Sequence, residues 1–157
     1  MTQAPATPED ESKAAAIEQY RLIESQQEEY GWRSAMIDVG DYVVVFVRVP
    51  KPEGRTFVMR LRFDDYPEIA PELRFVAPDV IDKPSEAAAP EERFYPTGPN
   101  IVGANQGRGP LPVPCITGHR DYYAGGWHGG WTNPPTHEHT PYQLVMNVRN
   151  AILNVWS

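Results

Sequence analysis

Cysteine is almost absent from this chain: its 157 residues contain one, Cys115. One cysteine cannot close an intramolecular disulfide, so the fold depends on its hydrophobic core rather than on cross-links. A reducing compartment is the simplest setting for such a chain, and we expect a cytoplasmic protein. The length fits one domain with a sizeable core, which we expect to span residues 1–157.

Long apolar runs are also lacking. No stretch approaches the ~20 apolar residues of a membrane-spanning helix. Residues 1–11 are polar and acidic, without the basic and apolar regions that form a signal peptide. We therefore expect no membrane association and no secretion, and a loose segment at residues 1–7.

Positive charge is in short supply, since the formal net charge is -7. Nucleic-acid binding needs clustered lysine and arginine, so we expect no nucleic-acid partner. One local cluster exists at Arg55, Arg60, Arg62 and Arg74. Such a cluster is typical of the solvated face of a sheet, or alternatively of a basic patch that docks an acidic protein.

The chain does contain two clear helix signals. Thr7 followed by Pro8 is typical of an N-cap and the first helical position, and the apolar stripe of this helix continues to about residue 29. Thr140 and Pro141 repeat the signal, which predicts a closing helix whose apolar stripe ends at residue 155.

Between the helices the hydrophobic period changes to two. Strands are predicted over residues 35–39, 42–49, 57–63 and 72–76. Their connections are short, so consecutive strands should pair as an antiparallel meander of four. Helices beside an antiparallel sheet make an α+β fold.

Residues 77–139 show almost no periodicity and hold most of the 17 prolines and 12 glycines. A connection this long inside one domain is typically functional. Residues 79–92 are acidic and rich in alanine, which fits a short helix or a mobile insertion. The aromatic residues between positions 94 and 131 form either a small core that holds the loop or a surface that accepts a partner.

Cys115 lies inside this irregular loop, where Pro110, Pro112 and Pro114 precede it and Gly118 follows. A thiol in such a loop is a candidate nucleophile, although a lone cysteine is also often a small buried hydrophobe. Exposure of the side chain separates the two interpretations.

Four histidines near Cys115 raise the alternative of a metal-dependent hydrolase. His119, His128, His137 and His139 supply ring nitrogens that zinc accepts together with a thiolate. Their spacing matches no zinc ligand frame, since there is no second cysteine pair and no His-x-x-x-His on a helix. We expect polar loop residues instead, with neither a metal nor a cofactor.

The strand region carries landmarks of a known family. Residues 60–67 read Arg-Leu-Arg-Phe-Asp-Asp-Tyr-Pro, and Pro71 and the strand 73–75 follow. This order resembles the third strand, the Tyr-Pro turn and the fourth strand of ubiquitin-conjugating enzymes.

Landmarks of the same family continue through the loop. Residues 95–101 resemble the segment that carries the family's His-Pro-Asn motif, and Cys115 falls at the position of its thioester cysteine. Trp131 with a proline at 134 or 135 resembles the Trp-x-Pro that follows the active site. In element order the resemblance covers residues 8–155.

Some positions depart from the family pattern. Gly98 stands where the histidine would be, and Asn100 lies fifteen positions before Cys115, which is longer than usual. One closing helix follows where most members have more. These features resemble divergent prokaryotic members that are encoded with an activating enzyme, a ubiquitin-like protein and a metallopeptidase.

The resemblance implies a UBC-like fold with a long active-site loop, and an acyltransferase of the ubiquitin-conjugating type. Such an enzyme accepts a ubiquitin-like protein from an activating enzyme as a thioester, here on Cys115, and passes it to an amine. The implied partners are the ubiquitin-like protein, the activating enzyme and the metallopeptidase of the same pathway. The alternative is a non-catalytic UBC/RWD-like module that binds a ubiquitin-like protein or a complex subunit.

Three further residues are candidates for roles around Cys115. Asn100 could donate a hydrogen bond to the reacting carbonyl oxygen, or only tie its own turn. His119 could lower the thiol pKa as an imidazolium or deprotonate the incoming amine, or be structural. The resemblance implies that Asp121 could deprotonate the amine instead, as acidic residues near the cysteine do in the family.

Overall fold

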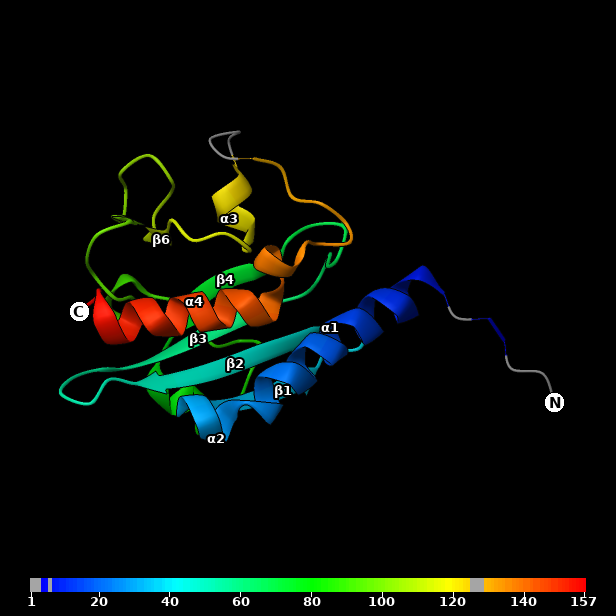
Figure 1. Cartoon of the computed structure of the whole chain (residues 1–157), viewed down its shortest axis with the longest axis horizontal. Coiled ribbons are helices and arrows are strands. Elements are labelled where there is room, and N and C mark those ends of the chain that lie inside the picture. Colours follow the sequence, from blue (N-terminus) through cyan, green and yellow to red (C-terminus); the bar gives the residue numbers. More distant parts are fainter. Residues whose placement is uncertain (1–3, 6, 125–128) are drawn as a thin grey trace.

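The fold is a layered α+β structure (Figure 1). The computed structural model describes residues 4–5, 7–124 and 129–157. Its main elements follow the chain in this order: α1 (Pro8–Ser25), α2 (Gln27–Tyr30), β1 (Arg33–Asp38), β2 (Val43–Pro50), β3 (Thr56–Arg62), β4 (Glu72–Val76) and α4 (Pro141–Asn154). The predicted first helix, four-stranded sheet and closing helix are thereby confirmed. None of the helices in the described part of the chain combines the length and apolar composition that crossing a membrane requires.

The sheet is an antiparallel meander in the order β1-β2-β3-β4. Its register sets Val45 of β2 opposite Leu61 of β3, and Leu61 opposite Leu73 of β4. Side chains alternate between the faces of a strand, so this register collects one set of residues on each face. The first strand begins at Arg33, slightly earlier than the sequence pattern indicates.

The two long helices begin where their capping residues predict. The Thr7 hydroxyl accepts a hydrogen bond from the Asp10 amide at 3.1 Å, and the Asp10 carboxylate accepts one from the Thr7 amide at 3.2 Å. Thr140 caps α4 by accepting from the amide of Gln143 at 3.3 Å. The first helix ends at Ser25, before the predicted boundary, and the short α2 follows it.

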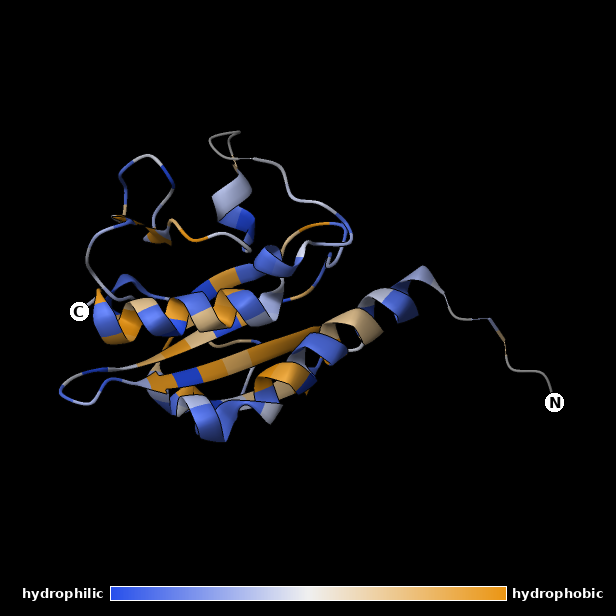
Figure 2. Ribbon diagram, viewed as in Figure 1, coloured by the Kyte–Doolittle hydropathy of each residue, from blue (hydrophilic) through white to orange (hydrophobic). Residues whose placement is uncertain are grey.

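Helices α1 and α4 cover one face of the sheet (Figures 1 and 2). The core between these layers contains Met59 and Phe75 from the sheet, Ile23 from α1 and Leu144 from α4, all buried. Removing this apolar surface from water is the main favourable contribution to folding.

The opposite face of the sheet is apolar as well. Val44, Phe46 and Val58 are fully buried there, and Ile81 of the 3-10 helix η1 (Pro78–Asp82) packs against them with 4 % of its surface exposed. The segment expected to be a short helix or a mobile insertion therefore contributes the cover of this face.

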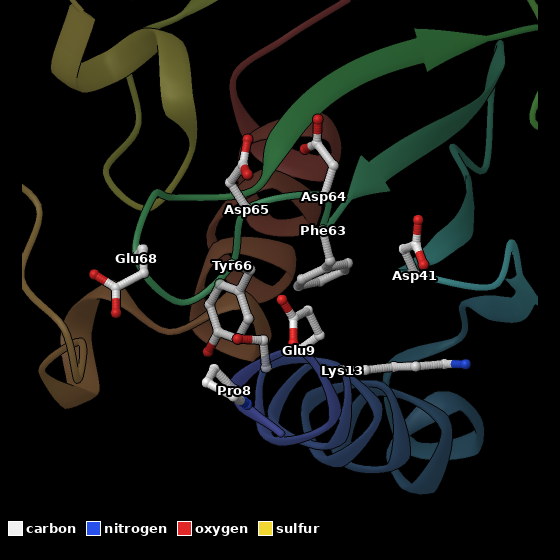
Figure 3. A pocket seen from close by; sticks show the side chains of 10 residues that line it. Pro8, Glu9, Lys13, Asp41, Phe63, Asp64, Asp65, Tyr66 and Glu68 are labelled. Carbon is white, nitrogen blue, oxygen red and sulfur yellow. The ribbon is translucent and has the colours of Figure 1, made fainter. Parts of the chain in front are cut away.

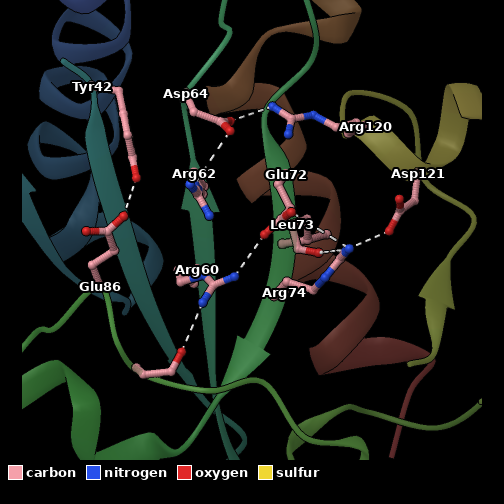
Figure 4. A network of polar contacts seen from close by, with 11 residues as sticks. Tyr42, Arg60, Arg62, Asp64, Glu72, Leu73, Arg74, Glu86, Arg120 and Asp121 are labelled. Carbon is pink, nitrogen blue, oxygen red and sulfur yellow. Dashed lines mark hydrogen bonds and ion pairs between the residues drawn. The ribbon is translucent and has the colours of Figure 1, made fainter. Parts of the chain in front are cut away.

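Three arginines of the cluster, Arg60, Arg62 and Arg74, belong to a network of polar contacts on the sheet (Figure 4), while Arg55 is exposed. Arg60 is 8 % exposed, and its guanidinium donates to the Ala88 carbonyl at 2.9 Å and to the Glu72 carboxylate at 2.8 Å. Arg62 lies 3.6 Å from the carboxylate of Asp64. The prediction of a solvated face is wrong for Arg60, because the segment that contains Ala88 covers it. A buried guanidinium needs such partners.

Ile81→Ala should lower the free energy of unfolding by about 2 to 4 kcal/mol, because it leaves a cavity between η1 and the sheet. Ile69→Ala removes the same atoms at a side chain that is 46 % exposed, and should change stability by less than about 0.5 kcal/mol. Urea unfolding followed by circular dichroism measures both variants. Equally small effects would contradict the packing of η1 on the sheet.

Candidate functional site

Cys115 lies at the end of a short strand pair. Strand β5 (Ile101–Val102) runs antiparallel to β6 (Val113–Pro114). The ladder continues by one residue, because the amide of Cys115 donates to the carbonyl of Asn100 at 2.7 Å. Asn100 and Cys115 are therefore cross-strand neighbours despite their separation in the sequence.

Cys115 is a free cysteine on the surface. The interpretation of a buried hydrophobic residue is therefore wrong. Pro112 and Pro114, which precede it, are both buried. Proline fixes one backbone dihedral, so an anchored and restricted segment presents the exposed thiol.

Asn100 is exposed and has a left-handed backbone conformation, with φ at 63°. Asparagine tolerates this conformation better than most residues. Its side-chain amide makes no hydrogen bond within the described residues, so it does not tie the turn as one interpretation expected. The side-chain amide therefore has no partner within the described residues, on a residue whose backbone pairs with Cys115.

The turn leading into β5 rests on residues that follow α4. Trp156 is 2 % exposed, and its indole N–H donates to the carbonyl of Pro99 at 2.7 Å. Thr97 and Ser157 exchange two backbone hydrogen bonds, of 3.0 and 2.8 Å. A Cβ on Gly98 would lie 2.9 Å from Cδ1 of Trp156. Gly98 therefore leaves room for the indole that supports the turn.

Trp156 is the site residue that the sequence patterns do not reveal. The predicted apolar stripe of α4 ends at Val155, and no spacing connects residue 156 with the turn. The one signal is Gly98, since glycine in place of a larger side chain indicates close approach by another group.

His119 is a buried support of the cysteine loop. Its side chain has no exposed surface, and Nε2 donates to the carbonyl of Pro114, the residue before Cys115, at 2.7 Å. A carbonyl only accepts, so Nε2 carries the proton, while Nδ1 has no partner within the described residues. Burial lowers the pKa of this ring from 6.5 to about 4, so it is neutral at neutral pH. His119 is therefore neither an imidazolium beside the thiol nor a base that an incoming amine can reach.

Asp121 lies on α3 (Arg120–Tyr123), a short helix that is tied to the sheet (Figure 4). Its carboxylate pairs with Arg74 of β4 at 2.5 Å. The neighbouring Arg120 pairs with Asp64 at 2.7 Å. The structure thus brings Asn100 next to the cysteine, and gives the carboxylate of Asp121 a structural partner on the sheet.

Aromatic residues after the cysteine pack together. The Tyr123 hydroxyl accepts from the amide of Gly118 at 3.1 Å and shares a hydrogen bond of 2.6 Å with Nδ1 of His139. Trp131 contacts Tyr123 and Tyr66, with ring centroids 5.7 and 6.2 Å apart. These contacts fit the interpretation of a small core that holds the irregular loop.

Two of the four histidines have partners that leave them poorly placed for a metal. His119 and His139 are engaged with the Pro114 carbonyl and the Tyr123 hydroxyl. His128 lies outside the described residues. Across residues 4–5, 7–124 and 129–157, no three His, Cys, Asp or Glu side chains converge as metal ligands.

Comparison with known proteins gives no relative for this arrangement. No family model, no curated protein and no solved structure matches the chain. The function of the cysteine loop therefore has to be inferred from its geometry and from the chemistry of its residues.

The buried His119 should make stability depend on pH. The ring binds a proton less readily in the folded chain, with a pKa of about 4, than at its usual value of 6.5. The neutral ring therefore makes its full contribution to the free energy of unfolding above pH 6.5, and this contribution is lost as the pH falls toward 4. Over this window the free energy of unfolding of the wild type should fall by about 3 kcal/mol more than that of His119→Gln, which lacks the titrating ring. Urea unfolding across the window tests this, and parallel curves for the two proteins would contradict it.

Gly98→Ala should destabilise the chain because its methyl group meets the ring of Trp156. Gly107→Ala is a matched control: Gly107 also has a positive φ, 97°, but nothing lies within 4 Å of its would-be Cβ. We expect Gly98→Ala to cost about 1 to 3 kcal/mol more than the control in urea unfolding. Equal losses of unfolding free energy in the two variants would mean that the Trp156 ring does not pack closely against residue 98.

Proposed function

We propose that the chain is a UBC-like conjugating enzyme that carries a ubiquitin-like protein as a thioester on Cys115. The observation that carries this proposal is the pairing of the exposed Cys115 with Asn100, whose side-chain amide is free. The order of helix, four-stranded meander, irregular loop and closing helix also supports it.

The loading step needs an accessible thiol. The thiolate of Cys115 attacks the C-terminal carbonyl carbon of the modifier, which the activating enzyme presents as its own thioester. A C–S bond to Cys115 forms, the C–S bond to the activating enzyme breaks, and the cysteine of that enzyme leaves as a thiolate. The surface position of Cys115 supplies the access that this exchange requires.

The transfer step needs a stabilised oxyanion. The amine nitrogen attacks the same carbonyl carbon, a C–N bond forms, and the C–S bond breaks to return the thiolate of Cys115. Negative charge grows on the carbonyl oxygen, to which the Asn100 amide donates. His119 is buried and Asp121 is paired with Arg74, so the amine proton passes to the water around the exposed cysteine.

A non-catalytic UBC/RWD-like module of the same fold is the second candidate. In its favour, His119 and Asp121 both hold structural partners, so neither of these two candidates serves Cys115 as a general base. Such a module would bind the ubiquitin-like protein or a complex subunit without forming a covalent bond.

Incubation with a candidate activating enzyme, ATP and its ubiquitin-like protein should give a thiol-sensitive adduct of this chain on a non-reducing gel. Cys115→Ala should abolish the adduct, and Cys115→Ser should replace it with an oxygen ester that resists thiol treatment. An activating enzyme that charges itself but never this chain would contradict the proposal. Binding of the modifier to Cys115→Ala, measured by calorimetry, would then support the binding module.

Asn100→Gly tests the oxyanion role, because glycine tolerates the left-handed backbone conformation and lacks the side-chain amide. Loading should be unchanged, while transfer to a free amine should slow about 100-fold. Asn105→Gly is the matched control, since Asn105 is also exposed and left-handed, with φ at 60°. Similar transfer rates for the two variants would remove Asn100 from the mechanism.

A further inference from the structure

A separate cavity of about 630 Å³ opens between the start of α1, the β1–β2 turn and the β3–β4 loop (Figure 3). Its lining includes Glu9 and Lys13 of α1, Asp41 of the turn, and residues 63–66 of the loop. No residue of the cysteine loop lines it. The cavity is therefore a site distinct from Cys115.

The floor of this cavity is aromatic. Phe63 and Tyr66 are 3 % and 4 % exposed, and their rings meet edge to face with centroids 5.2 Å apart. The Tyr66 hydroxyl makes no hydrogen bond within the described residues, and Figure 3 shows it directed toward Pro8. Burial and the nearby Glu18 carboxylate raise its pKa to about 12, so the hydroxyl keeps its proton. The ring of Tyr66 is almost fully buried, but its hydroxyl oxygen is open to the cavity, where a bound hydrogen-bonding group can pair with it.

The rim of the cavity carries uncompensated negative charge. Glu9, Asp41 and Asp65 are exposed, and their carboxylates have no partner among the described residues. Lys13, which also lines the cavity, is already paired with Asp38 at 2.8 Å. Carboxylates at the rim of a cavity attract a cation.

We propose that this cavity binds a lysine or arginine side chain from a basic segment of a partner protein. The cationic head donates hydrogen bonds to the nearest rim carboxylate and to the Tyr66 hydroxyl, while the other carboxylates attract it at longer range. The methylene stem packs on Phe63. The cavity is larger than one side chain, so residues that flank the cation in the segment also enter it.

Two other occupants fit this cavity less well. A divalent cation needs several oxygen ligands that converge on one point, and no three acidic, histidine or cysteine side chains do so in the described chain. Residues 1–7, which precede α1, contain no lysine or arginine side chain. We therefore assign the basic segment to a partner protein.

Titration of the ¹⁵N-labelled chain with a hexalysine peptide, followed by amide chemical shifts, tests this inference. The shifts should concentrate at residues 9–13 and 63–68. The double variant Glu9→Gln/Asp65→Asn should bind about tenfold more weakly, because two charged acceptors are lost. Tyr66→Phe keeps the ring and should weaken binding about threefold.

Controls separate the cavity from general attraction to an acidic chain. Glu53→Gln/Asp79→Asn makes the same change of charge at exposed positions outside the cavity and should bind as the wild type does. Equal weakening by the two double variants, or shifts spread over other surfaces, would overturn the proposal. So would spermine or Mg²⁺ that gives the same shifts with equal affinity, because a small cation would then be the ligand.

The binding test is independent of the thioester chemistry. Cys115→Ala should bind hexalysine as the wild type does, so failure of adduct formation and failure of the cavity to bind are separate results. Thermal unfolding of every variant checks that a loss of binding is not a loss of fold.

Discussion

Five consecutive residues of β2, Val43 to Val47, have no exposed surface, so water has to be excluded from both faces of the sheet at once. An antiparallel sheet commonly leaves one face to solvent, and this one does not. Helices α1 and α4 cover one face, while η1 and the residues around it cover the other. The long segment after β4 is therefore needed for packing before it reaches the cysteine.

The segment that covers the second face also buries carbonyl and carboxylate groups, and arginines of the sheet donate hydrogen bonds to them. Arg60 reaches the Ala88 carbonyl and the Glu72 carboxylate, while Arg74 on the next strand reaches Asp121 of α3. One rigid sheet thereby holds both the segment over its far face and the helix that follows the cysteine loop (Figure 4). This arrangement explains how a half of the chain that is rich in loops presents a side chain in a defined position.

Short-range patterns predicted most of the fold. Alternating residues revealed the strands, and Thr7 and Thr140 marked the helix starts, because capping and pleating are local interactions. The supports of the site depend on which distant segments meet, as when Trp156 reaches the Pro99 carbonyl. Burial of Arg60 and His119 escaped prediction for the same reason, since the residue types indicate exposure until the covering segment is known.

The spacing between Asn100 and Cys115 has a simple origin in the strand pair. Residues 103–112 form the loop that connects β5 with β6. Within this loop the amide of Asn105 donates to the Gly109 carbonyl at 2.8 Å. Loop insertions cost little free energy when the ends of the loop are already paired. The β5–β6 loop can therefore lengthen or shorten during evolution without moving Asn100 and Cys115 out of register. It is also a natural place to graft a recognition segment beside the thiol.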